Sequence, residues 1–294
     1  MTRQELITTL QTKGIDRVYG RALSRCLKQE LEATYHRLTE NTPSPYLSFQ
    51  QINMYLRCGL QYYLRYVEGI KIPPKAIISL GQSFHQTTRF NYTDKIKTGQ
   101  DKALSELTDY FVEDFFNRKS QTIWQEDEKP DDFIKEGVSL ITLAREQRFP
   151  EVQPKEVEHE FIIPFENVDY SLMGFIDLID QYGIIRDNKT SSKSYTEEQV
   201  KTDMQLTCYA YANNVNNPQL TQRVGFDIFV KTKTPKIQVL EGTRSYQDYK
   251  RFLTIVGIVA DGIFKNVFLP ASLGHWACSP DWCGYWDRCH QELS

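Results

Sequence analysis

Three short β-branched segments in the middle of the chain constrain its fold more than any other feature of the sequence. They cover residues 157–165, 171–180 and 183–188, and turn residues separate them. Segments of this kind are typical of antiparallel strands. Residues 225–231 and 236–241 predict a further hairpin, which turns at a Thr-Pro pair. Because helical patterns lie before and after these segments, the sequence predicts an α+β fold.

Helical periodicity accounts for most of the remaining residues. Helices are expected over residues 48–69, 80–92, 197–212 and 246–264. The first of them begins at Ser48, whose side chain can cap the N-terminus of a helix. Residues 94–150 read as a helical insertion in two pieces, because the acidic stretch 126–131 contains a proline that ends a helix.

The chain is expected to divide into an N-terminal helical arm, residues 1–46, and a domain over residues 47–294. A chain of 294 residues, of which 40% are hydrophobic, can bury a sizeable core. The formal net charge of −3 excludes a protein that coats nucleic acid by bulk positive charge, although it allows a local basic channel. The sequence has no apolar run long enough for a transmembrane helix and no secretory pattern in its first residues. We therefore expect a cytoplasmic protein that does not associate with membranes.

Two aspartates and a lysine are expected to meet at the ends of neighbouring strands. Asp187 and Lys189 are two residues apart, so they point to the same face of a strand, and Asp177 lies on the preceding strand. Two carboxylates in a partly buried place repel each other unless a cation such as Mg²⁺ lies between them. With the lysine near a metal-bound water, such a site suits phosphodiester hydrolysis. A D-x-K motif alone more often marks a surface salt bridge.

The order and spacing of these residues resemble the PD-(D/E)XK nuclease superfamily, and within it the RecB-like branch. That branch includes the AddB nuclease domain and the CRISPR-associated RecB-like exonucleases. The resemblance covers residues from about 47 to 290 and implies a restriction-endonuclease-like core, with a central mixed sheet between helices and a separate helical lobe. The Mg²⁺ or Mn²⁺ ligands that it implies are His85, Asp177, Asp187 and the carbonyl of Asn188.

The same resemblance implies roles for residues around the metal ligands. Lys189 would position the attacking water and stabilise the developing charge. Gln205 and Tyr209 share one face of a helix, because they are four residues apart, and would orient the substrate strand. A further carboxylate on the first strand is expected, and Glu158 is preferred to Glu160. The residue before Asp187 is usually aliphatic in this family, whereas Arg186 stands here; its side chain is expected to point away from the metal.

Three cysteines fall within the last seventeen residues and are close enough in sequence to bind one metal centre. They are Cys278, Cys283 and Cys289, and a fourth ligand is expected. The RecB-like resemblance implies Cys58 as that ligand and a structural [4Fe–4S] cluster in a cysteine-rich tail of residues 278–289. From the residue types alone zinc is an equal candidate, and two disulfides or four unrelated thiols are the alternatives without a metal.

Basic and aromatic side chains are expected near the site, where they would hold the nucleic acid. The residues in question are Lys193, Tyr195, Lys231 and Lys233. Such a mixture suits single-stranded DNA, because bases stack on aromatic rings and phosphates pair with cations. The sequence has no motif that reads bases, so cleavage is expected to be independent of sequence.

Together these residues favour a metal-dependent DNA exonuclease that acts on single-stranded DNA or DNA ends, in recombination, repair or CRISPR adaptation. The sequence has no G-x-x-x-x-G-K-[ST] motif, so any unwinding requires a partner. The partners that the resemblance implies are a helicase, an annealing protein or a CRISPR integrase. Two alternatives stay open: an endonuclease directed by a partner, and a non-catalytic subunit that binds DNA ends or supports assembly.

Overall fold

The computed structural model describes most of the chain outside the segment between residues 13 and 45. The described residues are 1–12, 46–165, 170–219 and 221–293, with residues 17–18, 21–22, 24, 31 and 35. The expected helical arm therefore lies largely outside the described residues, apart from its first helix, α1 (Arg3–Thr12), and two short antiparallel strands, β1 (Arg17–Val18) and β2 (Arg21–Ala22), which were expected to be helical. The division of the chain at residues 46 and 47 stays a prediction.

Two compact units are formed, and each is built from more than one stretch of the chain. The sheet unit consists of Pro73–Glu160 and Phe175–Phe252, and the cysteine unit consists of Met1–Ile72, Phe161–Gly174 and Leu253–Ser294. None of the helices that the structure describes is both long and apolar enough to cross a lipid bilayer.

Most of the helices and strands lie wholly or partly in the sheet unit. They are α5 (Ala76–Thr98), α6 (Leu104–Arg118), α7 (Pro130–Gln147), β4 (Pro154–Pro164), β5 (Ser171–Asp180), β6 (Ile185–Ser191), α8 (Glu197–Thr202), α9 (Met204–Asn216), β7 (Gln222–Val230), β8 (Lys236–Arg244) and the first part of α10 (Tyr246–Phe264). The cysteine unit contributes β1 (Arg17–Val18), β2 (Arg21–Ala22), β3 (Tyr46–Leu47), α3 (Phe49–Arg57), α4 (Gly59–Tyr62), the π-helical turn η2 (Tyr63–Val67) and α11 (Trp286–Leu293).

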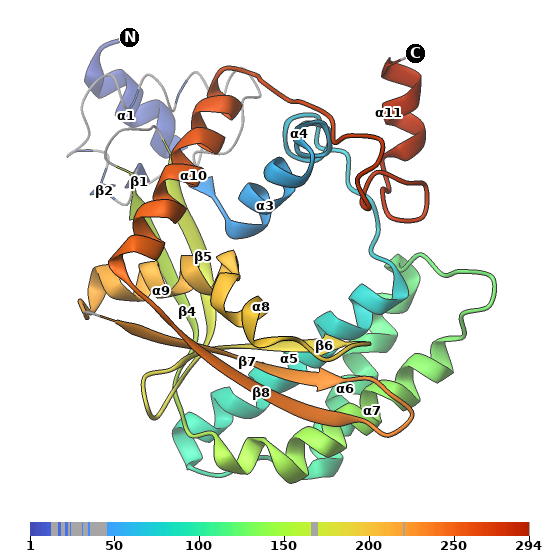
Figure 1. Ribbon diagram of the computed structural model, residues 1–294. Helices are drawn as coiled ribbons and strands as arrows, with labels where there is room; N and C mark the ends of the chain where they lie inside the picture. The colour runs from blue at the N-terminus through green and yellow to red at the C-terminus, as the bar shows by residue number, and fades with distance from the viewer. Residues whose placement is uncertain are drawn as a thin grey trace. The chain divides into compact units, whose positions relative to one another are not determined.

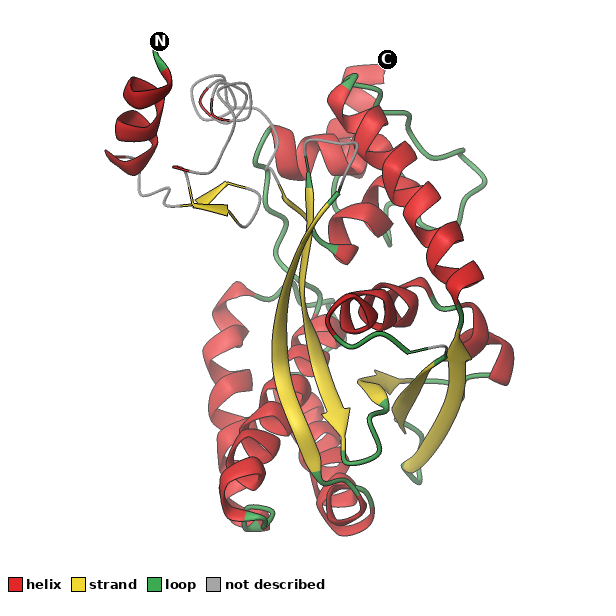
Figure 2. Ribbon diagram, turned by 90° about the vertical axis from the view of Figure 1, so that its left-hand side faces the viewer, coloured by secondary structure: helices red, strands yellow, loops and turns green. Residues whose placement is uncertain are grey.

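The central sheet is mixed, as expected from the sequence. Its strands follow the order β3-β5-β6-β7-β8, and β4 also pairs with β5; β4 and β5 are the long strands in Figure 2. Strands β5 and β6 are antiparallel, β6 and β7 are parallel, and β7 and β8 form the predicted antiparallel hairpin. The parallel pair explains why β6 is buried along its first four residues, since a helix layer covers each face of this part of the sheet.

Within the sheet unit, helices cover both faces of strands β6, β7 and β8. Figure 1 shows α5, α6 and α7 on one face and α8 and α9 on the other. The α5–α7 layer holds the main apolar core, whose rings include Phe84 and Phe229 with their centroids 4.6 Å apart. Burial of each such side chain stabilises the folded state by about 1.5–3 kcal/mol. This core holds α5 firmly against the strands.

One predicted helix start is confirmed, and one predicted helix is divided in two. Ser48 caps α3 through a capping box with Gln51, as its position before the helix predicts. The single helix expected over 197–212 is wrong, because Asp203 interrupts it. Asp203 has extended backbone and its carboxylate accepts a hydrogen bond from the Leu206 N–H at 2.7 Å, so a new helix, α9, begins there.

The turn between β5 and β6 is held by one buried carboxylate. The Asp180 Oδ1 atom accepts hydrogen bonds from the backbone N–H groups of Tyr182 and Ile184, at 2.9 and 3.0 Å. Gly183 has φ 73° in this turn, a conformation that favours glycine. The turn therefore fixes how β6 enters the sheet.

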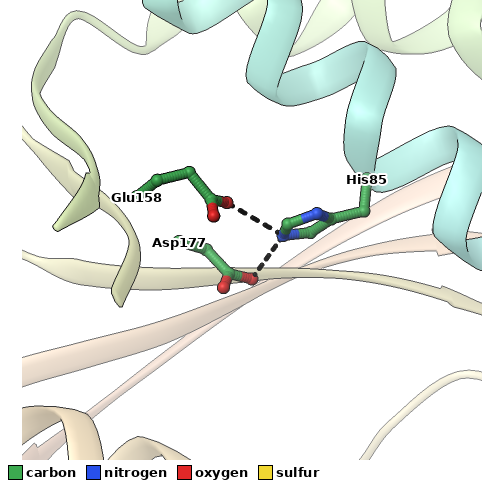
Figure 3. Close-up of side chains that lie close together, drawn as sticks. All are labelled: His85, Glu158 and Asp177. Atoms are coloured by element: carbon green, nitrogen blue, oxygen red, sulfur yellow. Dashed lines mark ion pairs between the residues drawn. The ribbon is translucent and has the colours of Figure 1, made fainter. Parts of the chain in front are cut away.

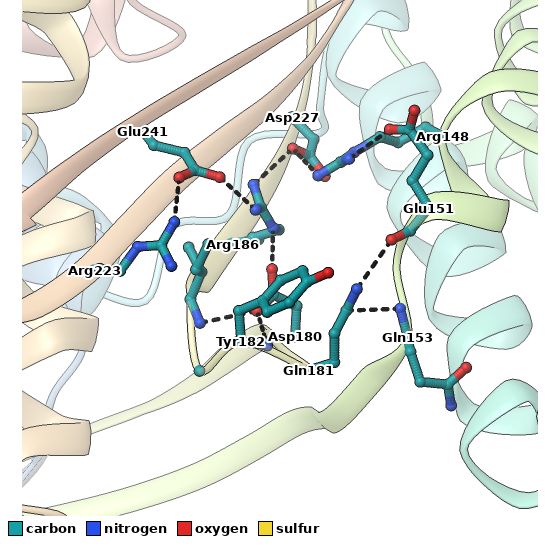
Figure 4. Close-up of polar contacts among 12 residues, drawn as sticks. Arg148, Glu151, Gln153, Asp180, Gln181, Tyr182, Arg186, Arg223, Asp227 and Glu241 are labelled. Atoms are coloured by element: carbon teal, nitrogen blue, oxygen red, sulfur yellow. Dashed lines mark hydrogen bonds and ion pairs between the residues drawn. The ribbon is translucent and has the colours of Figure 1, made fainter.

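Arg186 lies at the centre of a buried ionic network (Figure 4). Its guanidinium contacts Asp180 at 2.6 Å, Asp227 at 3.3 Å and Glu241 at 2.6 Å. Asp227 also pairs with Arg148 at 2.8 Å. Because successive side chains alternate along a strand, Arg186 points to the face of β6 opposite Asp187. The polar residue at this position thus joins strands β5, β6, β7 and β8.

Candidate active site

The two predicted aspartates lie where strands β5 and β6 separate. The ladder between these strands comprises the pairs Leu178–Arg186 and Ile179–Ile185. Asp177 and Asp187 are the next residues along the two antiparallel strands, immediately beyond the last pair. Both side chains are therefore held by strand backbone at one fork in the sheet.

Strand β4 is distorted where it brings a third carboxylate to this fork. Glu158 has φ 51°, in the left-handed region that residues other than glycine rarely adopt. The buried positions of the strand change from even to odd numbers across it, from Pro154 to Phe161 and Ile163. Such a change of phase is typical of a β-bulge, which re-aims a side chain next to a functional site. The bulge turns the Glu158 carboxylate toward Asp177.

His85 of α5 faces both carboxylates (Figure 3). Its Nε2 atom lies 3.1 Å from Asp177 Oδ2 and 3.6 Å from Glu158 Oε1. The three side chains place their ligand atoms within 4.8 Å of one another, and all three are partly buried. One imidazole and two carboxylates at this spacing form a donor set that fits a divalent cation.

The charges of the site shift its pKa values in opposite directions. Burial raises the pKa of Asp187 to about 8, with Lys189 lowering it and Asp177 raising it. Burial also raises the pKa of Asp177, but the hydrogen bond and charge of His85, together with Asp187 and Lys189, outweigh it and leave the pKa of Asp177 below its usual value. For His85, burial lowers the pKa, whereas Asp177, Glu158 and Asp187 together raise it above the ordinary value. The carboxylates around His85 thus favour positive charge at this position.

Lys189 connects Asp187 to helix α9. The ammonium group lies 2.6 Å from Asp187 Oδ2 and donates a hydrogen bond to Gln205 Oε1 at 2.9 Å. The Gln205 amide in turn donates to the Tyr209 hydroxyl at 2.9 Å. The structure therefore places Lys189, which is predicted to be catalytic, beside Gln205 and Tyr209, which are predicted to orient the substrate strand.

The remaining predicted residues lie in different surroundings. The Asn188 side chain is buried and its Oδ1 atom has no hydrogen-bond partner among the described residues, while its carbonyl stays a predicted ligand. Glu160 is exposed, in contrast to Glu158. Lys193 and Lys233 are exposed as well.

Two of the expected DNA-binding residues are already engaged within the protein. The Lys231 side chain is 6% exposed and pairs with Glu136 at 3.4 Å. Tyr195 packs edge-on against Phe226, and Gln238 bonds to both its backbone N–H and its carbonyl, each at 2.8 Å. Gln238 holds this loop as a neighbouring strand would, a role that the sequence did not reveal.

Arg89 is a further residue beside the site that the sequence reasoning missed. Its guanidinium lies 3.8 Å from Glu158 Oε2, and half of the side chain (49%) is exposed. Arg89 follows His85 by four residues on α5, so the helical period could have indicated that the two share a face. This cation faces solvent at the edge of the carboxylate cluster.

The four predicted cysteine ligands line one pocket in the cysteine unit. Other residues of this pocket are Gln61, Ala271, Tyr285, Trp286 and His290. None of the cysteines that the structure describes forms a disulfide. Burial and the nearby thiols of Cys283 and Cys58 raise the pKa of Cys278, as expected of thiols gathered without a cation.

Gly59, beside Cys58, permits a close approach of two backbone segments. A Cβ atom at this position would lie 2.8 Å from the backbone nitrogen of Leu269. The Leu60 N–H donates to the Leu269 carbonyl at 3.3 Å, which links the start of α4 to the segment before the cysteine-rich tail. Any larger residue at 59 would push this segment away from Cys58.

The family of the chain follows from its sequence as well as from this geometry. A family model described as the PD-(D/E)XK nuclease superfamily matches residues 46–290. The chain belongs to this superfamily, and its mixed sheet between helices is the expected fold. No curated protein matches the sequence.

Two solved structures are similar to the chain. One is the crystal structure of a candidate exonuclease from Eubacterium rectale, with a TM-score of 0.51 and 13% identity, covering 87% of this chain and 91% of that one. Another is the crystal structure of SSO0001, with a TM-score of 0.37 and 15% identity over 91% of this chain and 95% of that one. At this identity the first supports the fold alone.

Proposed function

We propose that the protein is a divalent-metal-dependent DNA exonuclease whose active centre is the fork between β5 and β6. The observation that carries the proposal is the meeting of His85, Glu158 and Asp177, with ligand atoms within 4.8 Å, beside the Asp187–Lys189 pair. With a neutral imidazole, the three carboxylates of the fork outnumber the two cations beside them, Lys189 and Arg89. A hard cation with oxygen ligands would complete the charge balance.

The residues of the fork have different roles in the proposed phosphodiester hydrolysis. His85, Glu158, Asp177 and Asp187, with the Asn188 carbonyl as a further ligand, would hold Mg²⁺ or Mn²⁺, which would supply Lewis-acid stabilisation of the phosphoryl oxygens. Lys189 is fixed between Asp187 and Gln205, so its ammonium is positioned to orient a water and to stabilise negative charge on a phosphate oxygen. Burial keeps this geometry rigid and strengthens each charge interaction.

The proposed substrate and pathway rest on residues beside the fork and on the resemblance to RecB-like nucleases. The structural neighbour described as a candidate exonuclease favours exonuclease action. Tyr195 beside the site and the exposed Lys193 and Lys233 suit stacking on and pairing with a single strand. The resemblance to RecB-like nucleases supports a cytoplasmic enzyme that processes DNA ends in recombination, repair or CRISPR adaptation. Its partner would be a helicase, an annealing protein or a CRISPR integrase.

We also propose that Cys58, Cys278, Cys283 and Cys289 hold a [4Fe–4S] cluster with a structural role. Two backbone N–H groups, those of Gln61 and Ala271, donate to the Cys58 sulfur at 3.4 and 3.3 Å. Such donors suit a thiolate. The choice of iron–sulfur over zinc rests on the RecB-like resemblance, because both centres accept four thiolates, and the metal content of the purified protein distinguishes them.

The test compares end-labelled linear and circular single-stranded DNA, each with Mg²⁺ or Mn²⁺ and with EDTA. Wild type should digest the linear DNA only, and Asp187→Asn and Glu158→Gln should abolish digestion. Glu160→Gln is the matched control, because Glu160 is on the same strand but exposed, and it should retain activity. Cleavage of the circles would favour the partner-directed endonuclease. If folded wild type binds DNA ends without cutting them, the protein is instead a non-catalytic subunit.

A further inference from the structure

Gln61 lies between a guanidinium group and a cysteine sulfur in the cysteine unit. Both Nε and Nη2 of Arg57 donate to Gln61 Oε1, at 3.1 and 2.6 Å. On the other side, Gln61 Nε2 donates to Cys283 Sγ at 3.4 Å. The Gln61 backbone N–H donates to Cys58 Sγ at 3.4 Å as well. One residue thus contacts two of the four sulfurs.

The orientation of this amide is fixed by its partners. Because the two Arg57 donors meet the same atom, that atom is the amide oxygen, and the nitrogen must face Cys283. The Gln61 side chain is 7% exposed, so water does not compete for these groups. A buried amide needs a partner for each of its ends, and a neutral thiol is a weak acceptor. The arrangement is suited to a sulfur that carries negative charge.

A cation and an amide in series make a stronger donor than an amide alone. The guanidinium withdraws electron density from the carbonyl, and hydrogen bonds in a chain polarise one another. Hydrogen bonds to cluster sulfurs are among the factors that set a reduction potential. Addition of an electron increases the negative charge on the sulfurs, so a donor aimed at one of them stabilises the reduced state more than the oxidised state.

We propose that Arg57 and Gln61 are a positioning pair that aims an amide N–H at the Cys283 sulfur and raises the reduction potential of the centre held by the cysteines. The proposal rests on the proposed cysteine-bound cluster, and it extends to how that cluster is tuned and retained. Arg57 acts through Gln61, because its guanidinium donates to the Gln61 Oε1 atom.

The experiment titrates anaerobically purified full-length protein with dithionite and follows the cluster by visible absorbance and electron paramagnetic resonance. Gln61→Leu removes the donor, and Gln61→Glu keeps the shape and the Arg57 contact but turns an acceptor toward the sulfur. We expect the potential to become more negative in the order wild type, Gln61→Leu, Gln61→Glu, and Arg57→Leu to shift it in the same direction. Gln50→Leu is the matched control, since Gln50 is exposed on α3, and it should not shift the potential.

Iron, sulfide and zinc contents are measured first, and circular dichroism checks folding of each variant. A cluster in wild type whose potential is unchanged in both Gln61 variants overturns the positioning pair and leaves the cluster standing. Folded wild type without iron or zinc overturns the cysteine-bound centre itself, and with it the pair. If the metal is zinc, the measurement is the loss of zinc to a chelator instead of the reduction potential. Zinc binding about 10–100-fold weaker in Gln61→Leu than in wild type supports the pair, and equal binding overturns it.

Discussion

The left-handed backbone at Glu158 predicts that two substitutions with the same effect on activity differ in their effect on stability. Replacing Glu158 by alanine removes the carboxylate but keeps a Cβ atom in a conformation that disfavours one. Replacing it by glycine removes the same carboxylate and relieves the conformation as well. We therefore expect Glu158→Gly to be more stable than Glu158→Ala, although glycine normally weakens a strand.

The size of the difference follows from two opposing contributions. The left-handed conformation costs a residue with a side chain about 1–2 kcal/mol. Glycine in a strand costs about 0.5–1 kcal/mol more than alanine, because it loses more chain entropy. The free energy of unfolding of Glu158→Gly should therefore exceed that of Glu158→Ala by about 0.5–1 kcal/mol.

Urea unfolding in EDTA, followed by far-ultraviolet circular dichroism, measures this difference in the absence of bound cation. With a slope of about 1–3 kcal/mol per M, the midpoints should differ by roughly 0.2–1 M. Both variants should lose metal-dependent nuclease activity to the same degree. The matched control is the same pair of substitutions at Glu160, two residues along β4, where alanine should be the more stable replacement.

Glycine no more stable than alanine at position 158, with the expected order at position 160, would refute the reasoning. The backbone at Glu158 would then be relaxed in solution, and the aim of its carboxylate would need another explanation. Activity retained in either variant would instead remove Glu158 from the metal ligands.

Other features of the molecule lead to further expectations. Mn²⁺ affinity, measured by electron paramagnetic resonance between pH 6 and 9, should rise by about tenfold per pH unit for each displaced proton and level off above about pH 8. The reason is that His85, whose pKa is raised, and Asp187, whose pKa is about 8, must lose protons before they bind the cation. Gly59→Ala should lower the free energy of unfolding by about 1–3 kcal/mol and reduce the iron content, as urea unfolding and iron analysis would show. Arg89→Ala should raise KM for DNA more than it lowers kcat and reduce the salt dependence of binding by about one counterion, in titrations at several salt concentrations. Arg186→Met leaves Asp180 and Asp227 without their shared partner and should cost about 3–5 kcal/mol in urea unfolding, against the surface control Arg223→Met.

The catalytic strand could be predicted from the sequence because its information is local. Alternation along a strand places Asp187 and Lys189 on one face and Arg186 on the other, and the structure has them so. The partners of Arg186 could not be predicted, since Asp227 and Glu241 lie on strands that only the folded sheet brings beside it. A single sequence does not state which strands become neighbours.

The distortion of β4 could not be predicted for a different reason. Simple alternation would place Glu158 and Glu160 on the same face, with nothing to distinguish them. The bulge arises because the surrounding structure over-determines a residue that would otherwise stay extended. Asp203, in contrast, is a good capping residue, so the break between α8 and α9 had a local signal in the sequence.

The pocket that joins Cys58 to the tail also sets an order of events during synthesis. Cys278 is made 220 positions after Cys58, and all the residues of the fork lie between them. At about 5–20 residues per second, roughly 10–40 s separate the two cysteines as they leave the ribosome. Strands β4 to β8 can pair within that time. A metal centre in this pocket can therefore close only after the strands of the fork have been made, and a chain interrupted before residue 278 could carry every residue of the fork and still lack it.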